Sequence, residues 1–170
     1  MSSSFPHAFT VEEANDLLPI LEAVFRKLDR PRSQLEARMG RIQVLDLIWG
    51  ARLGDPQNPD RGEFLEERAA IRRTLQEIEE MVESRFRPLG IRFPPGGLEE
   101  GLVDFPTTLD GRWVFLCWRR GEPRVHSWHE IAGGFRGRQS LTPSVAARMG
   151  RSEGDVEPPP EWDDGWISGS

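Results

Sequence analysis

Hydrophobic residues in the first half of the chain recur every three or four positions, the spacing of one face of an α-helix. The first series starts after a capping box, in which Thr10 is the N-cap and Glu13 lies three residues later. It consists of Val11, Ala14, Leu17, Leu18, Leu21, Val24, Phe25 and Leu28. Because the series continues past Pro19, the pattern predicts a helix that is kinked there and does not end.

Two further series follow at the same spacing. The second consists of Leu35, Met39, Ile42, Leu45, Trp49 and Leu53, and the third of Phe64, Ile71, Leu75, Ile78, Val82 and Phe86. Asp29-Arg30-Pro31 predicts a short break or a second kink before the second series. Turn-forming residues 54–60 separate the second series from the third. The pattern therefore predicts helices over residues 10–88 that form a long antiparallel hairpin or bundle.

The hydrophobic pattern changes its period after residue 100. Residues 89–100 contain Pro94-Pro95-Gly96-Gly97, which predicts a linker. The strands predicted after it are Leu102–Thr108, Trp113–Trp118 and Arg124–Trp128. Asp110-Gly111, between the first two strands, favours a type I′ turn. We therefore predict a three-stranded antiparallel β-meander over residues 101–130.

These patterns together predict an α+β fold, a long antiparallel helical hairpin or bundle packed with a small three-stranded antiparallel β-meander. A chain of 170 residues fits one domain, here residues 9–150, after an N-terminal tail at residues 1–8. Residues 151–170 hold six Asp and Glu residues against one Arg, so most of the net charge of -6 lies there. We predict a disordered acidic tail, whose Trp162 and Trp166 leave docking on a partner open.

Composition excludes several classes of protein. No hydrophobic run approaches the roughly 18 residues of a membrane span, and the N-terminus lacks the features of a secretion signal. With one Cys the chain cannot form an internal disulfide, which fits a reducing compartment. We therefore expect a cytoplasmic protein. The acidic chain carries no recognised nucleic-acid motif, which argues against nucleic acid as a partner.

Three stretches of the chain resemble a known family. They are FTVEEANDLLP at residues 9–19, LGDPQNPD at residues 53–60, and GLVDFPTTLDGRWVFLCWRRGEPRVHSWHEIAGGFRGRQSL at residues 101–141. These residues resemble an uncharacterised family of small bacterial proteins that share a domain of unknown function. The resemblance implies a helical hairpin joined to a small sheet and an intracellular bacterial setting. It implies no activity, because none is established for the family.

Arginine and tryptophan residues gather in the predicted sheet region. Guanidinium groups bind carboxylate or phosphate at two points and stack on indole rings. The candidate binding residues are Asp104, Trp118, Arg119, Glu122, Trp128, His129, Glu130 and Arg138. They predict a site for an anionic small ligand or an acidic peptide. Structural ion pairs among the same residues are the alternative.

Asp104, His129 and Glu130 form a candidate site for a divalent metal, since imidazole and carboxylate ligands suit Zn, Mn or Fe. His126 and His129 have opposite parity on a strand and therefore face opposite ways. The alternative is that His129 binds a carboxylate and orders the end of the strand. Cys117 lies in the middle of an apolar run, where we expect a buried and unreactive thiol.

Two functions remain open from the sequence. The first is a ligand- or protein-binding module that uses the sheet region, with a protein partner or a homo-oligomer formed through an exposed seam on the helices. The alternative is a metal-dependent or acid/base enzyme centred on His129, Glu130 and Asp104. No motif for a nucleophile or a phosphate loop is present to favour the enzyme.

Overall fold

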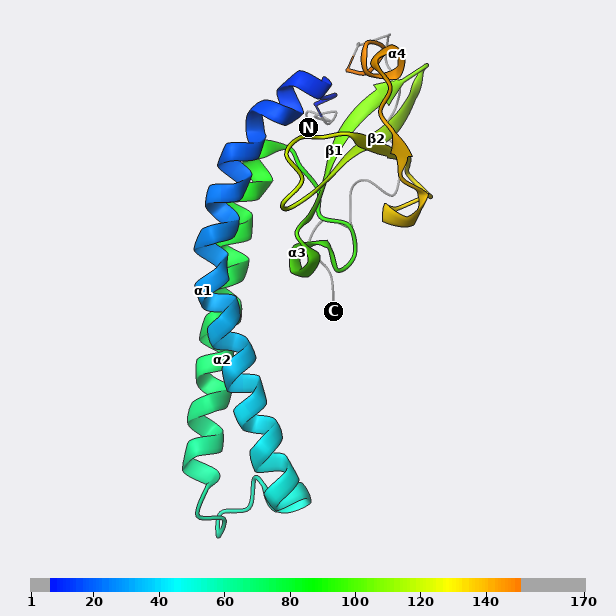
Figure 1. Ribbon diagram of the computed structural model, residues 1–170. Helices are drawn as coiled ribbons and strands as arrows, with labels where there is room; N and C mark the ends of the chain where they lie inside the picture. Colours follow the sequence, from blue (N-terminus) through cyan, green and yellow to red (C-terminus); the bar gives the residue numbers. More distant parts are fainter. Residues whose placement is uncertain (1–6, 151–170) are drawn as a thin grey trace, which may run out of the picture. The chain divides into compact units, whose positions relative to one another are not determined.

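The computed structural model describes residues 7–150 and divides the chain into two compact units (Figure 1). The sheet unit contains residues 7–22 and 86–150, and the hairpin unit is Ala23–Arg85. The acidic tail predicted at residues 151–170, and most of the predicted N-terminal tail, lie outside the described residues.

Helix α1 (Val11–Trp49) begins in the sheet unit and continues through the hairpin unit. The predicted capping box is confirmed. The Glu13 amide donates to Thr10 Oγ1 at 3.1 Å, and the Thr10 amide donates to Glu13 Oε2 at 2.9 Å. The expected break or kink at residues 29–31 does not divide the helix, which runs for 39 residues as one element. The first two hydrophobic series therefore belong to a single helix.

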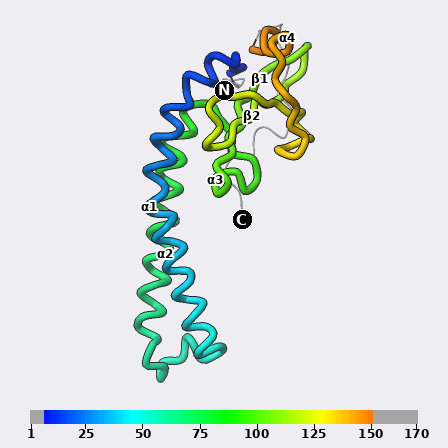
Figure 2. The backbone as a smooth tube through the Cα atoms, viewed as in Figure 1, coloured from blue at the N-terminus to red at the C-terminus, as the bar shows by residue number. Residues whose placement is uncertain are grey.

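The hairpin unit consists of the later part of α1 and helix α2 (Arg61–Met81), which run side by side in opposite directions (Figure 2). Arg38 Nη1 donates to Glu67 Oε2 at 3.0 Å, and Trp49 Nε1 donates to Asp60 Oδ2 at 2.8 Å. The buried side chains of this unit are mostly apolar, and all of the following except Ala70 come from the predicted series: Val24, Phe25, Leu28, Leu45, Leu53, Ala70 and Val82. The predicted antiparallel helical hairpin is therefore confirmed.

The sheet contains four strands in the order β1-β2-β3-β4, and each neighbouring pair is antiparallel. They are β1 (Leu102–Leu109), β2 (Arg112–Arg119), β3 (Ser127–Glu130) and β4 (Gln139–Ser140). The α+β prediction is confirmed, although three strands were expected. The third strand starts later than expected because the Val125 amide donates to Asn15 Oδ1 on α1, at 2.8 Å, instead of joining a ladder.

Short helices complete the sheet unit. Helix α3 (Gly97–Glu100) lies within the predicted linker, and helix α4 (Pro143–Ala146) follows β4, with Thr142 as its N-cap.

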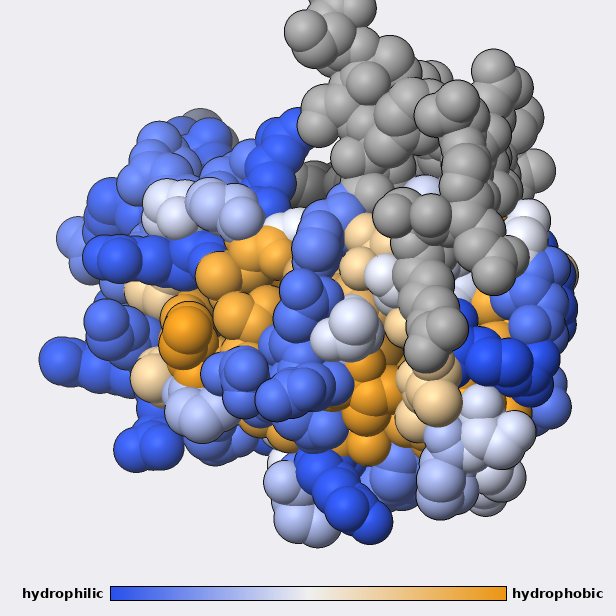
Figure 3. All heavy atoms as spheres, turned by 90° about the horizontal axis from the view of Figure 1, so that it is seen from above, coloured by the Kyte–Doolittle hydropathy of each residue, from blue (hydrophilic) through white to orange (hydrophobic). Residues whose placement is uncertain are grey.

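In the part of the chain that the structure describes, no helix is both long and apolar enough to cross a membrane. Figure 3, a view from above, shows hydrophobic side chains lying between hydrophilic ones on this face.

One face of the sheet is covered by the residues at the start of α1. The Phe9 amide donates to the Pro106 carbonyl at 2.8 Å, and Thr107 Oγ1 donates to the Phe9 carbonyl at 2.6 Å. The Phe9 and Phe105 rings pack edge to face with their centroids 5.4 Å apart. Residues of β1 that alternate with these, including Asp104, therefore point to the opposite face.

Candidate metal centre

Three neighbouring strands each contribute one polar side chain to the face of the sheet opposite α1. The two-residue turn at Asp110 and Gly111 pairs Leu109 with Arg112, and the same register places Asp104 on β1 opposite Cys117 on β2. His129 on β3 pairs with Phe115, which lies two residues before Cys117 and therefore on the same face. A carboxylate oxygen, the thiol sulfur and an imidazole nitrogen lie within 4.8 Å of one another. We call this set the Asp–Cys–His cluster.

The Asp–Cys–His cluster is sealed from solvent. Asp104 is 1% exposed, Cys117 0% and His129 2%. Asp104 Oδ1 lies 3.1 Å from His129 Nε2, whereas Asp104 Oδ2 has no hydrogen-bond partner in residues 7–150. A buried polar atom without a partner costs about 1–3 kcal/mol of stability. The cluster therefore contains a carboxylate that the protein satisfies on one side only.

The tautomer of His129 follows from its hydrogen bonds. His129 Nδ1 lies 2.8 Å from the Glu130 carbonyl oxygen, and a carbonyl oxygen only accepts, so Nδ1 carries a hydrogen. In neutral imidazole the other nitrogen, Nε2, then carries a lone pair, and this lone pair faces Asp104 Oδ1. Two acceptors facing each other repel. The contact is stabilised only when a proton or a metal cation lies between them.

The protonation states of the cluster are shifted by its burial. Burial and the nearby Asp104 carboxylate raise the pKa of the Cys117 thiol. Burial lowers the pKa of His129, but the hydrogen bond and the charge of Asp104 raise it, and the net shift is upward. Both shifts favour the protonated form when no metal is bound, which agrees with the unreactive thiol expected for Cys117 from the sequence.

A second polar group lies beside the cluster, around Glu122. Arg138 Nη2 donates to Glu122 Oε1 at 2.7 Å and to Ser127 Oγ at 2.9 Å, and the Arg119 amide donates to Glu122 Oε2 at 2.8 Å. Burial raises the pKa of Glu122. The hydrogen bonds from Arg119 and Arg138 lower this pKa, and together the lowering effects outweigh burial, so the net shift is downward. Arg138 and Glu122 thus form a structural ion pair.

The candidate binding residues Trp118 and Glu122 line a pocket of about 400 Å³. Its remaining lining residues come from α1 and from the turn after β2: Asn15, Leu18, Pro19, Glu22, Gly121, Pro123 and Arg124. Trp118 Nε1 donates to the Glu122 carbonyl at 2.9 Å, which holds the indole in place. Trp128 is instead buried within the sheet. The pocket contains no member of the Asp–Cys–His cluster.

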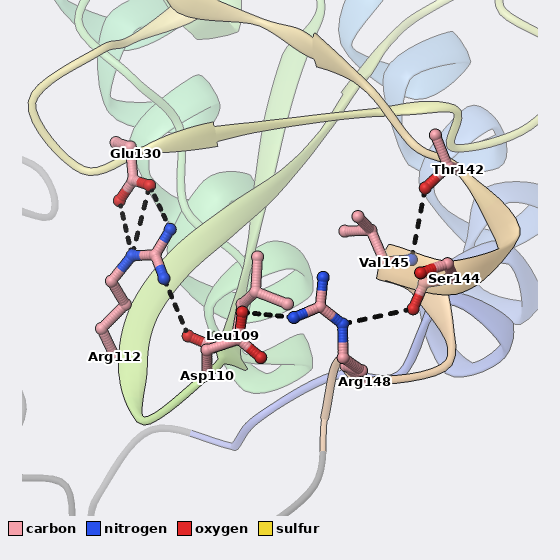
Figure 4. Close-up of polar contacts among 8 residues, drawn as sticks. All are labelled: Leu109, Asp110, Arg112, Glu130, Thr142, Ser144, Val145 and Arg148. Carbon is pink, nitrogen blue, oxygen red and sulfur yellow. Dashed lines mark hydrogen bonds and ion pairs between the residues drawn. The ribbon is translucent and has the colours of Figure 1, made fainter.

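The Glu130 carboxylate does not join Asp104 and His129. Glu130 pairs with Val114, so its side chain lies on the other face of the sheet. Arg112 Nε donates to Glu130 Oε2 at 3.2 Å, as Figure 4 shows, and this guanidinium lowers the pKa of Glu130. Only the carbonyl of Glu130 reaches His129. His126 is also separate, because it precedes β3 and lies 3.5 Å from Glu122.

Cys117 is the member of the cluster that the sequence reasoning did not assign to a site. A usable signal was present. A two-residue turn at Asp110 and Gly111 pairs the residues on either side of it, and counting back along both strands places Asp104 opposite Cys117. The position of His129 could not be counted in the same way, because the segment before β3 is irregular.

The fold and the cluster define an α+β protein in which a helical hairpin is followed by a four-stranded antiparallel sheet with a buried Asp–Cys–His cluster. The chain belongs to the uncharacterized conserved protein family DUF2203, whose family model matches residues 7–141. Comparison with curated proteins gave no match, and neither did comparison with solved structures.

The donor atoms of the cluster are of the kinds that hold a metal ion. A carboxylate, a thiol and an imidazole are all metal ligands, and zinc accepts each of them. All three side chains are buried, and the one pocket described above is lined by other residues. No observation among residues 7–150 supports the enzyme alternative.

Proposed function

We propose that this protein is a metal-binding module, and that a divalent cation is held between Asp104 and His129 on the sheet. The observation that carries this proposal is the contact of His129 Nε2 with Asp104 Oδ1 at 3.1 Å, beside the unpartnered Asp104 Oδ2. Nδ1 of His129 donates to a backbone carbonyl, which is how a metal-binding histidine is commonly oriented.

A shared proton is the competing explanation of the same contact. An imidazolium beside a carboxylate accounts for the approach of Nε2 to Oδ1, and the raised pKa of His129 supports it. A proton at that position leaves Asp104 Oδ2 with only the neighbouring Cys117 thiol, a weak donor, to interact with. A cation uses Oδ2 as well as Nε2, so it accounts for more of the geometry. The two explanations differ in one measurable quantity, which is the metal content of the protein.

The proposal is tested by elemental analysis of the full chain purified without chelator and then incubated with Zn²⁺. Asp104→Asn and His129→Gln keep the size of each side chain and remove its ability to bind the metal. Asp110→Asn and His126→Gln are matched controls, because both residues are exposed and lie outside the cluster. We expect about one ion per chain in the wild type and in both controls, and little in the two cluster variants.

Wild-type protein that retains no metal would overturn the proposal. Loss of metal from the controls equal to that from the cluster variants would do the same, since the ions would then be bound at the surface. Circular dichroism of each variant separates loss of the site from loss of the fold.

The chemistry of the cluster also supports a setting. A thiol persists where the compartment is reducing, and Cys117 is the only Cys of the chain. We propose the bacterial cytoplasm as the place where this protein acts. Cell fractionation followed by immunoblotting measures the compartment in which the protein is found. Its presence in an exported, oxidising compartment would contradict this proposal.

A second candidate function, assembly with a second copy of the chain, is favoured by one observation in the hairpin unit. Val44, Leu47 and Ile48 are exposed on one face of α1, and Leu47 is 86% exposed. An apolar patch of this kind can pair with the same patch on another copy about a two-fold axis. Light scattering after gel filtration tests it. We expect a dimer that Leu47→Glu converts to a monomer and that the same change at Leu75 on α2 leaves intact, whereas a monomeric wild type at all concentrations contradicts it.

A further inference from the structure

We infer that Cys117 is a thiolate ligand of the proposed ion, which makes the centre selective for zinc and chemically similar ions. This inference rests on the proposed function and extends it from two ligands to three. It changes the expected role of Cys117 from an unreactive buried thiol to a metal ligand. It also replaces Glu130, whose carboxylate binds Arg112 on the other face of the sheet, as the third ligand.

The first support is the position of the sulfur. Asp104 and Cys117 are directly paired residues of adjacent antiparallel strands, so their side chains stand next to each other. The three donor atoms lie within 4.8 Å of one another, and ligands of a tetrahedral zinc ion lie about 3.3–3.6 Å apart. Side-chain rotations that move the donor atoms by about 1 Å close this difference without a change in the strands.

The second support is the unpartnered Asp104 Oδ2, which is buried on the same face as the sulfur. A water molecule beside Oδ2, with a proton between Nε2 and Oδ1, is the alternative, and it leaves the sulfur without a role. A cation bound by Oδ2, Nε2 and the sulfur gives all three atoms a ligand role with one ion. On binding, the thiol proton and the proton between His129 and Asp104 leave to solvent, so the ligands are a thiolate, a neutral imidazole and a carboxylate.

The third support is a buried cation on the same face, Arg138. Burial and the Asp104 carboxylate raise the pKa of the Cys117 thiol, and the positive charge of Arg138 acts in the opposite direction. Arg138 Nε is buried and has no hydrogen-bond partner among the described residues, so it has a hydrogen to donate. Arg138 is itself held by Glu122 and Ser127, at 2.7 and 2.9 Å. The guanidinium therefore stabilises negative charge on this face of the sheet.

The ligand set determines the class of ion. Thiolate and imidazole ligands suit zinc and the similar ion Co²⁺, whereas Mg²⁺, Ca²⁺ and Mn²⁺ favour sites made only of oxygen ligands. Because the ligands come from β1, β2 and β3, the ion links three strands of the sheet. Because all three ligands are buried, the ion is not presented to a substrate at the surface.

The experiment is titration of metal-free full-length protein with Co²⁺, followed by absorption spectroscopy. A thiolate bound to Co²⁺ gives an intense charge-transfer band in the near ultraviolet, which oxygen and nitrogen ligands do not give. The chain has one Cys, so such a band in the wild type assigns Cys117 as a ligand without any variant. We expect the band to saturate at one equivalent and to disappear when Zn²⁺, but not Mg²⁺, is added.

Two variants assign the effect further. Cys117→Ser should abolish the band. It should also weaken Zn²⁺ binding more than the loss of an outer-sphere partner does, which is about 10- to 100-fold. Ser140→Ala, at an exposed position of β4, is the control that should keep the band.

The outcomes separate this inference from the proposed function. Stoichiometric Co²⁺ binding to wild-type protein without a charge-transfer band overturns the role of Cys117 and leaves the proposed metal-binding function standing. No binding of Co²⁺ or Zn²⁺ overturns both. A band that Mg²⁺ abolishes as readily as Zn²⁺ overturns the selectivity.

Discussion

Two buried polar atoms distinguish one face of the sheet at the scale of single residues. Asp104 Oδ2 and Arg138 Nε are the buried side-chain atoms without a hydrogen-bond partner in the described part of the chain. Another buried polar atom on this face, Ser127 Oγ, is satisfied, because it accepts a hydrogen bond from Arg138 Nη2 at 2.9 Å. Incomplete hydrogen bonding is therefore confined to the surroundings of Cys117, where we propose the ion.

Glu122 gives a prediction on pH at this scale. Its folded pKa lies below the ordinary value of about 4.3, so its charge contributes stability that is present above that value. This stability is lost as the pH falls through the lower folded pKa. Glu122→Gln should lower the free energy of unfolding by about 1.5–3 kcal/mol at pH 7. The difference from wild type should shrink in acid.

Urea denaturation at pH 7 and in acid measures this effect. Glu66→Gln on α2 is the matched control, because Glu66 is exposed. A difference between wild type and Glu122→Gln that stays constant with pH would show that the ion pair with Arg138 adds nothing to stability.

At the scale of elements, the start of α1 depends on its capping box. Thr10 accepts a hydrogen bond from the Glu13 amide at 3.1 Å, and the adjacent Phe9 carries contacts to β1. Thr10→Ala should lower the free energy of unfolding by about 1 kcal/mol. Ser33→Ala, at an exposed position inside α1, is the control and should have an effect near zero or slightly stabilising. Equal losses in the two variants would contradict the role of the cap.

The backbone geometry of the β1–β2 turn predicts that a Gly→Ala change destabilises the protein there, whereas the same change inside α1 stabilises it. Asp110 and Gly111 have φ values of 50° and 77°, as a type I′ turn requires, and this turn sets the pairing of Asp104 with Cys117. Gly111→Ala should cost about 1–2 kcal/mol, because an L-residue is disfavoured there. Gly40→Ala, inside α1 with no atom close to the added methyl group, should stabilise the protein by about 0.5–1 kcal/mol. Denaturation curves of the two variants that shift in the same direction would be incompatible with this backbone geometry.

Elements with a strong local signal could be predicted from the sequence. Three features depend on residues close together in the sequence: the capping box at Thr10, the helical series and the Asp110-Gly111 turn. They could therefore be predicted without knowledge of the rest of the fold. The continuity of α1 through Pro31 did not follow from the local sequence, because proline predicts an interruption there. The start of β3 at Ser127 could not be predicted because the preceding Val125 is held by a distant residue, Asn15. Strand β4 has two residues, too few for a periodic pattern.

Only part of the candidate site could be predicted from the sequence, because the contacts between its residues depend on how the strands pair. Asp104 and His129 were named from their chemistry, and the structure brings them within 3.1 Å. Glu130 was named as their neighbour in sequence, but adjacent residues of a strand face opposite ways. Cys117 was assigned to the core, where it does lie, and its place beside Asp104 depends on the register of the two strands.

At the scale of the whole molecule, the proposed ion lies in the sheet unit and stabilises the folded chain by linkage. An ion that binds only the folded state adds about 4 kcal/mol at a free concentration 1,000 times its dissociation constant. Zn²⁺ should therefore raise the melting temperature of the metal-free wild type by several degrees, and Asp104→Asn should remove most of this rise. Calorimetry measures it, and an equal rise in both proteins would place the ion elsewhere.

The most direct test of the central claim, that Asp104, Cys117 and His129 hold a metal ion, is X-ray absorption spectroscopy at the zinc edge. Full-length protein loaded with one equivalent of Zn²⁺ should show one sulfur at about 2.3 Å and nitrogen or oxygen ligands at about 2.0–2.2 Å. Because the chain has one Cys, the sulfur distance identifies Cys117 as its source. A first shell of oxygen and nitrogen alone would contradict the account.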